Sequence, residues 1–282
     1  MGAAPDIWLI CNPASGSNDA AGLAALEDRC GDLGFRIAGK TVFPEEDLPD
    51  GAALDAAGVG LVAIFTGDGT INAVIGRLDG WGGQVLILPG GTMNLLYHRL
   101  HGDRPFEEVL RLVAAGEADV RRPGVIGCNR GVALAGLLAG PGTSWFDVRE
   151  TMRDGDVLGV VESAAQAIGE TLAEPGIACR EAGSTEGYPL IMLTPHDEGI
   201  EVAAYHAETT AEFLSQGWAL LRRSFREGPH DVLGTFDRLI LASTDGAPFG
   251  IMIDGEKREA EAVEEFRLVA CGVDLLATAT DD

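Results

Sequence analysis

The chain has 282 residues, of which 46% are hydrophobic, and this is enough for one large or two ordinary globular domains. Its formal net charge is -24 at pH 7, and Lys40 and Lys257 are its only lysines. Because so acidic a surface repels phosphate backbones and anionic head groups, we expect no nucleic-acid partner and at most a peripheral contact with membranes.

The cysteines and the lengths of the apolar runs indicate the cell compartment in which the protein is located. The five cysteines are widely scattered without a CxxC spacing, which is typical of reduced thiols in a cytoplasmic protein. The first residues lack the basic start and long apolar stretch of a signal peptide. Apolar runs such as residues 132–139 are too short to span a bilayer. We therefore expect a cytoplasmic protein.

The N-terminal part of the chain alternates short apolar runs with helical patterns. Runs that predict buried strands occupy residues 7–11, 59–65 and 85–88. A helical pattern follows each run, and Pro105 opens a further helix that continues through Ala115. Strands that alternate with helices predict an α/β domain with a largely parallel sheet.

These helical patterns have recognisable starts and faces. Ser17 or Asn18 can cap the first helix, and the third begins near Thr92. The second presents one apolar face, made of Ile71, Val74, Ile75 and Leu78. Each face of this kind is expected to pack against the sheet.

The pattern changes after Arg121-Arg122-Pro123-Gly124. Short strands are predicted beyond it, at residues 132–138, 189–193, 200–204, 238–242, 249–253 and 266–270. Helical patterns interrupt them at residues 157–173 and 209–223. We therefore predict an α/β domain over residues 1–122 and a mainly antiparallel β-rich domain with helical insertions over residues 123–282.

Glycine-rich breaks follow the three predicted strands of the first domain, at residues 12–16, 66–70 and 89–92. In an open parallel sheet such breaks lie together at the carboxyl edge, where ligands bind. Glycine lets backbone N–H groups approach a polyanion, and helix N-termini favour negative charge. Although ordinary turns use the same residues, three breaks at corresponding places predict a phosphate-binding site.

Asp68, between two glycines, allows two interpretations. A carboxylate beside phosphates is repelled unless a cation intervenes, which favours a direct or water-bridged contact with Mg²⁺. The alternative is an aspartate that stabilises its own turn or the N-terminus of a helix.

The three breaks also carry a resemblance. Asn-Pro-x-Ser-Gly, Gly-Asp-Gly-Thr and Pro-Gly-Gly-Thr-x-Asn occur in this order within residues 7–122. As a set they resemble the catalytic domain of the diacylglycerol kinase and sphingosine kinase family, especially its soluble bacterial lipid kinases. The resemblance implies an ATP site in a cleft between two domains, the second of them β-sandwich-like and part of a lipid site.

It also implies roles for individual residues, carried over from the motifs. The residues that would line the ATP site are Asn12, Ser15 and Gly16, with Thr41 near the nucleotide. Those that would hold the phosphates and, indirectly, Mg²⁺ are Gly67, Asp68, Gly69 and Thr70. The rim would be completed by Gly91, Thr92 and Asn94.

A further segment, Ile253-Asp254-Gly255-Glu256, is similar to the family's Asp-Gly-Glu segment. It implies that Asp254 is the general base and that Glu256 supports it, although positioning and charge neutralisation supply most of the rate of phosphoryl transfer. Asp-Gly between apolar and charged residues is also the usual signal of a tight β-hairpin. Both interpretations can hold together.

The sequence departs from the family pattern at three positions. Thr66 stands where the family usually has glycine, and Ala73 and Leu95 stand where it commonly has carboxylates. We expect an ATP- and Mg²⁺-dependent kinase of a lipid hydroxyl. The alternatives are a kinase of a soluble acceptor, as in the NAD kinases with their Gly-Asp-Gly loop, and a nucleotide- or lipid-binding protein without catalysis. His98 and His101 offer either a metal site or a cationic helix end.

Overall fold

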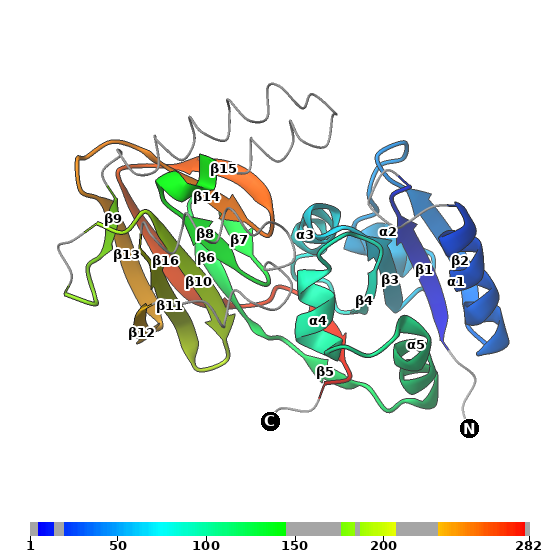
Figure 1. The fold of residues 1–282 in the computed structure, drawn as a ribbon. Helices are drawn as coiled ribbons and strands as arrows, with labels where there is room; N and C mark the ends of the chain where they lie inside the picture. The colour runs from blue at the N-terminus through cyan, green and yellow to red at the C-terminus, as the bar shows by residue number, and fades with distance from the viewer. Residues whose placement is uncertain (1–4, 14–19, 145–175, 184–186, 207–230, 280–282) are drawn as a thin grey trace, which may run out of the picture. The chain divides into compact units, whose positions relative to one another are not determined.

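The computed structural model describes residues 5–13, 20–144, 176–183, 187–206 and 231–279 (Figure 1). The chain divides into two compact units. The first comprises residues 1–123 together with residues 270–282, and the second comprises residues 124–269.

A six-stranded, largely parallel sheet forms the centre of the first unit, as the sequence predicts. Only β5 runs antiparallel to its neighbour, β17. The strands in spatial order are β2 (Arg36–Val42), β1 (Asp6–Cys11), β3 (Leu61–Thr66), β4 (Gln84–Pro89), β17 (Asp274–Ala277) and β5 (Asp119–Arg121). Strand β3 is buried along its whole length, which is characteristic of a central parallel strand covered on both faces.

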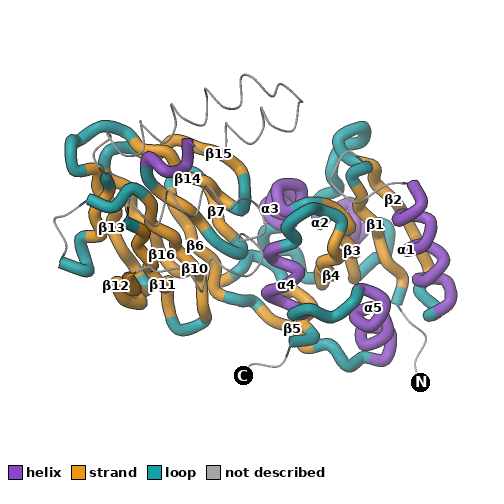
Figure 2. The backbone as a smooth tube through the Cα atoms, in the orientation of Figure 1, coloured by secondary structure: helices purple, strands orange, loops and turns teal. Residues whose placement is uncertain are grey.

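The α-helices of the described residues all belong to this unit and gather around its sheet (Figure 2). They are α1 (Ala20–Asp32), α2 (Gly51–Ala56), α3 (Asp68–Arg77), α4 (Leu95–His101) and α5 (Phe106–Ala115). The apolar face predicted for α3 is buried, as expected. Helix α4 begins at Leu95 rather than near Thr92, because Asn94 has a left-handed backbone (φ 53°) and caps the helix. Within the described ranges, no helix has the length and apolar character needed to cross a membrane.

The C-terminal strand β17 differs from the predicted division of the chain, which assigned residues 123–282 to the second domain. It pairs in parallel with β4 and antiparallel with β5. Leu275 and Leu276 are buried there, so an apolar run near the end of the chain fills the interior of the first sheet. The backbone N–H groups of Thr278 and Ala279 then donate to the carbonyl of Leu100 in α4, at 3.0 and 2.9 Å.

The described residues of the second unit form two antiparallel sheets. One has the order β12 (Asp231–Phe236), β11 (Gly199–Tyr205), β10 (Leu190–His196), β8 (Leu137–Ala139), β14 (Phe249–Ile253) and β15 (Glu256–Ala260). The other has the order β7 (Gly131–Ala133), β6 (Gly124–Cys128), β16 (Val263–Ala270), β13 (Arg238–Ser243) and β9 (Ile177–Cys179). A short 3₁₀ helix, η1 (Pro141–Ser144), follows β8.

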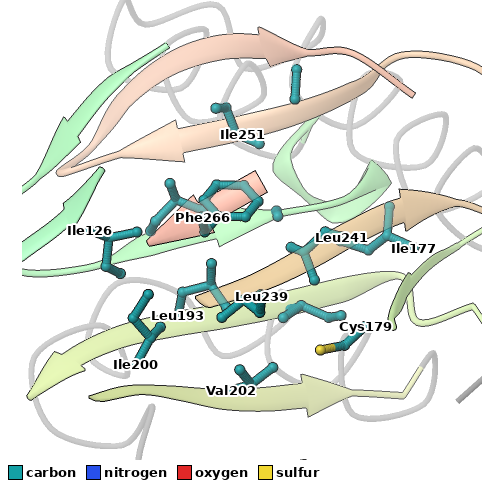
Figure 3. Packing of buried hydrophobic residues seen from close by; sticks show 14 of the residues in the cluster. Ile126, Ile177, Cys179, Leu193, Ile200, Val202, Leu239, Leu241, Ile251 and Phe266 are labelled. Carbon is teal, nitrogen blue, oxygen red and sulfur yellow. The ribbon is translucent and has the colours of Figure 1, made fainter. Parts of the chain in front are cut away.

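One hydrophobic core holds these two sheets together (Figure 3). Leu193, Val202 and Ile251 come from the first of them, and Leu241 and Phe266 from the second. All five side chains are almost completely buried. The unit is therefore a two-layer β structure with its apolar face turned inward.

The strand predicted at residues 132–138 is two strands, β7 and β8, separated by residues 134–136. The break arises because the backbone of these residues turns to bind Asp254, described below. The helices predicted at residues 157–173 and 209–223 lie outside the described residues.

Candidate phosphate-binding site

Strand register brings the glycine-rich breaks to one edge of the first sheet. Cys11 at the end of β1 pairs with Phe65 of β3, and Thr66 pairs with Pro89 at the end of β4. The chain passes from β1 to β2 on one side and continues at β3 on the other, so the strand order reverses between β1 and β3. Ligands of open α/β sheets bind outside the carboxyl ends of strands at such a point.

A hydrogen bond connects the first two breaks across this reversal point. Nδ2 of Asn12, directly after β1, donates to Oγ1 of Thr70 in the first turn of α3, at 3.2 Å. The asparagine of the first motif and the threonine of the second therefore lie together. Gly67 precedes α3 as its N-cap, and Asp68 and Gly69 begin the helix, so a helix N-terminus, which favours negative charge, lies at this break.

The second and third breaks approach each other through glycine backbones. A Cβ placed on Gly91 would lie 2.6 Å from Cα of Gly67, and one on Gly90 would lie 2.5 Å from the backbone nitrogen of Thr66. Contacts this short have no room for a side chain. The two glycines are thus required by the close packing of the two loops.

Asn94 organises the third break. Its side chain is buried, and Oδ1 accepts a hydrogen bond of 2.8 Å from the backbone N–H of Gly91. Thr92, between them, is exposed. Asn94 therefore shapes the loop, whereas Thr92 is placed on its surface.

Asp68 lies between the starts of two helices. It occupies the first turn of α3, and its Oδ1 accepts a long hydrogen bond of 3.4 Å from the backbone N–H of Leu96 in the first turn of α4. This geometry agrees with the interpretation of Asp68 as a carboxylate at the N-terminus of a helix. Among the described residues, no three His, Cys, Asp or Glu side chains are grouped to hold a metal. A Mg²⁺ ion here would take one carboxylate from the protein and its remaining ligands from phosphate and water, which is usual for magnesium.

Thr41 and Cys11 are buried at this edge and do not lie on its surface. The Thr41 side chain is buried in β2, and its hydroxyl accepts a hydrogen bond of 3.0 Å from Nε1 of Trp8. Burial raises the pKa of the Cys11 thiol, so it stays protonated at neutral pH. Ser15 and Gly16 of the first motif lie outside the described residues.

Asp254 forms the predicted hairpin. It is the first of two turn residues between β14 and β15, which are closed by the Ile253–Glu256 pair. Asp254 and Gly255 have φ values of 46° and 91°, as a tight hairpin requires. The Asp254 side chain is only 6% exposed, whereas Glu256 is exposed and lies 4.0 Å from Arg258.

Backbone N–H groups hold the Asp254 carboxylate. Leu134 donates to Oδ2 at 2.7 Å, and Ala135 and Gly136 donate to Oδ1 at 2.9 and 3.2 Å. These three residues could not be predicted from the sequence, because they bind Asp254 through backbone N–H groups across about 120 positions. Such a contact requires no particular residue type.

The three departures from the family pattern have different consequences. The Thr66 side chain is completely buried and donates to the carbonyl of Gly67, so the extra hydroxyl does not face a ligand. Ala73 is exposed on α3 and Leu95 is half-buried at the start of α4, and neither supplies a charge.

The basic segment after the third break ends a helix. His101 is fully buried, with Nδ1 at 3.0 Å from Oγ1 of Thr278, whereas His98 is exposed. Arg104 closes the segment by donating to the carbonyl of His101 at 3.1 Å. The two histidines therefore do not share a metal site.

Comparison with known proteins finds a family model that matches this part of the chain. Residues 6–123 match the family model of the diacylglycerol kinase catalytic domain. The predicted resemblance to this family is confirmed over these residues. The sheet edge with its three breaks lies within the matched part of the chain.

The fold of this chain has counterparts among solved structures. A crystal structure of a diacylglycerol kinase from Bacillus anthracis str. Sterne is 15% identical, with a TM-score of 0.59, and the match covers 97% of each chain. A second structure, of a protein proposed to be a diacylglycerol kinase from the same organism, is 16% identical with a TM-score of 0.62, covering 97% of this chain and 95% of that one. At such identities the likeness concerns the fold alone. No curated protein matches the chain in sequence.

Proposed function

We propose that this protein is an ATP- and Mg²⁺-dependent kinase that phosphorylates a hydroxyl group of a lipid. The hydrogen bond between Asn12 and Thr70 carries this proposal, because it joins two phosphate motifs of a diacylglycerol kinase catalytic domain at the reversal point of the sheet. ATP would supply the phosphoryl group, and Mg²⁺ would neutralise charge on the phosphates.

The residues of the chain would act by binding and by taking up one proton. The first turn of α3 would bind the phosphates with backbone N–H groups, and the Gly90–Gly91 loop would pack against it and shape the site. As the acceptor oxygen bonds to the γ-phosphorus, the bond between that phosphorus and the oxygen of ADP breaks. The hydroxyl proton passes to the carboxylate of Asp254. Glu256, two residues on, would support that carboxylate.

The acceptor class is tested with radiolabelled ATP and mixed micelles that contain diacylglycerol, sphingoid base or monoacylglycerol. We expect labelled lipid in at least one preparation, and expect Asn12→Ala to weaken ATP binding about 3- to 10-fold through the lost hydrogen bond. Thr70→Val should weaken it similarly, and the double variant should cost less than the sum of the two changes.

Other results would reject the proposal in defined ways. Formation of NADP from NAD would identify a soluble acceptor instead. Bound ATP without turnover on any acceptor would identify a nucleotide-binding protein, in keeping with the uncharged residues Ala73 and Leu95.

A further inference from the structure

The contacts of Asp254 exceed what a hairpin turn needs. A two-residue turn is closed by the strand pair Ile253–Glu256 and tolerates several residues at its first position. Here that position carries a non-glycine residue with φ 46°, and its carboxylate is bound by three successive backbone N–H groups. The turn itself requires the left-handed backbone, whereas the three bonds to the carboxylate are additional to it.

The three donors belong to one short segment, Leu134–Gly136, which connects β7 and β8. Leu134 is buried and donates the shortest of the bonds, at 2.7 Å. The segment also accepts in return, because the N–H of Asp254 donates to the carbonyl of Gly136 at 3.2 Å. Consecutive N–H groups that converge on one point form an anion-binding concavity.

We infer that Leu134–Gly136 is a carboxylate-binding loop that fixes the direction of the Asp254 carboxylate, and that its three residues are positioning residues for phosphoryl transfer. This inference rests on the proposed function, which makes Asp254 the base. A base must be held within hydrogen-bond reach and in a defined direction to accept its proton. Both carboxylate oxygens are held here by rigid backbone rather than by a mobile side chain.

The loop predicts that a small free carboxylate can replace the side chain. In Asp254→Gly the left-handed backbone is retained without strain and the concavity is left open to formate. We expect this variant to lose at least about 100-fold in lipid phosphorylation and to regain at least 10-fold in formate. We also expect its thermal midpoint to fall by about 4 °C or more and to rise again in formate, but not in chloride of equal ionic strength.

Asp197 provides a matched control. It is the first residue of another two-residue hairpin in the same unit, between β10 and β11, but it is exposed and accepts one backbone N–H, from Gly124 at 3.2 Å. Asp197→Gly should show no formate-dependent rise in thermal midpoint.

A second variant tests the loop itself. Ala135→Pro removes one donor to Oδ1, whereas Ala135→Ser retains it. Because an N–H donor favours the charged carboxylate, we expect the acid limb of the kcat–pH profile to move to higher pH only in the proline variant. If Ala135→Pro unfolds, Asp254→Asn, which keeps the size of the side chain, serves in its place. It should stay folded and lose activity without formate rescue.

The outcomes separate this inference from the proposed function. If the wild type phosphorylates no lipid, the proposed function fails, while formate binding to Asp254→Gly still reports on the loop. If the wild type is active but formate changes neither the thermal midpoint nor the activity of Asp254→Gly, the inference that Leu134–Gly136 binds carboxylates is wrong. An active Asp254→Gly without formate would equally overturn its positioning role.

Discussion

His101 makes the stability of the first unit depend on pH. It lies in α4, is completely buried, and its Nδ1 is 3.0 Å from Oγ1 of Thr278 near the C-terminus. Burial lowers its pKa from 6.5 to about 4, because a charged imidazolium would lose its hydration there. The folded protein therefore keeps this ring neutral at pH values where the unfolded chain already binds a proton.

The sign and size of the effect follow from this difference. Stability from His101 is complete above the unfolded value of 6.5 and is lost as the pH falls toward the folded value of about 4. Proton linkage gives a loss of about 2 kcal/mol between about pH 8 and pH 5, and about 3 kcal/mol by pH 4. The loss is large compared with the net stability of a typical domain.

Urea unfolding at about pH 8, 6.5 and 5 measures this loss. Trp8 and Trp81 report on the first unit, so tryptophan fluorescence is recorded in a background where the other two tryptophans are replaced by phenylalanine. Protonation of the many carboxylates affects every variant equally, and the difference between variants isolates the histidine. His101→Gln should be less stable than the wild type at pH 8 but should lose about 2 kcal/mol less on acidification to pH 5.

The matched control is His98→Gln, which changes an exposed imidazole on the same helix. The free energy of unfolding of this variant should depend on pH as that of the wild type does. If His101→Gln and the wild type lose equal stability between pH 8 and pH 5, the reasoning from burial is refuted.

Two further changes probe the first unit. Gly91→Ala should weaken ATP binding at least about 10-fold by isothermal titration calorimetry, because its Cβ would lie 2.6 Å from Cα of Gly67. The control is Gly76→Ala on α3, whose Cβ would have no atom within 4 Å and which should be neutral or slightly stabilising. Equal ATP binding by both variants would contradict the close approach of the loops. Leu275→Ala in β17 should lower the free energy of unfolding, measured in urea, by about 2–5 kcal/mol. Val120→Ala on neighbouring β5, whose side chain is half exposed, should lower it by less than about 1 kcal/mol. Similar losses in both variants would mean that β17 is not part of the core.

Sequence reasoning succeeded where the signal is local. Buried strands and the helix opened by Pro105 depend on residues close together in the chain, and the structure contains them, although the run at residues 132–138 is divided. The glycine breaks at residues 66–70 and 89–92 are also present, whereas residues 14–16 of the first break lie outside the described residues. The Asp254–Gly255 hairpin is of the same kind, because a tight turn is determined by its own residues. These features were enough to predict the parallel sheet and the edge where the breaks meet.

The features that were missed depend on distant partners. Strand β2 is only partly apolar, and its Gly39 is required because the ring of Trp8 in β1 lies against it. Residues 132–138 form a continuous apolar run, yet the backbone breaks at residues 134–136 to bind a side chain about 120 positions away. Such pairings are decided by tertiary packing, which overrides local preference.

Strand β17 determines the order in which the chain can fold. The second unit is one continuous stretch, residues 124–269, so its described strands are available before residues 274–277 have been synthesised. The first sheet, in contrast, has a gap between β4 and β5 until residues 274–277 arrive to fill it. During synthesis from the N-terminus, the sheet of the first unit is therefore completed only after the second unit has been synthesised.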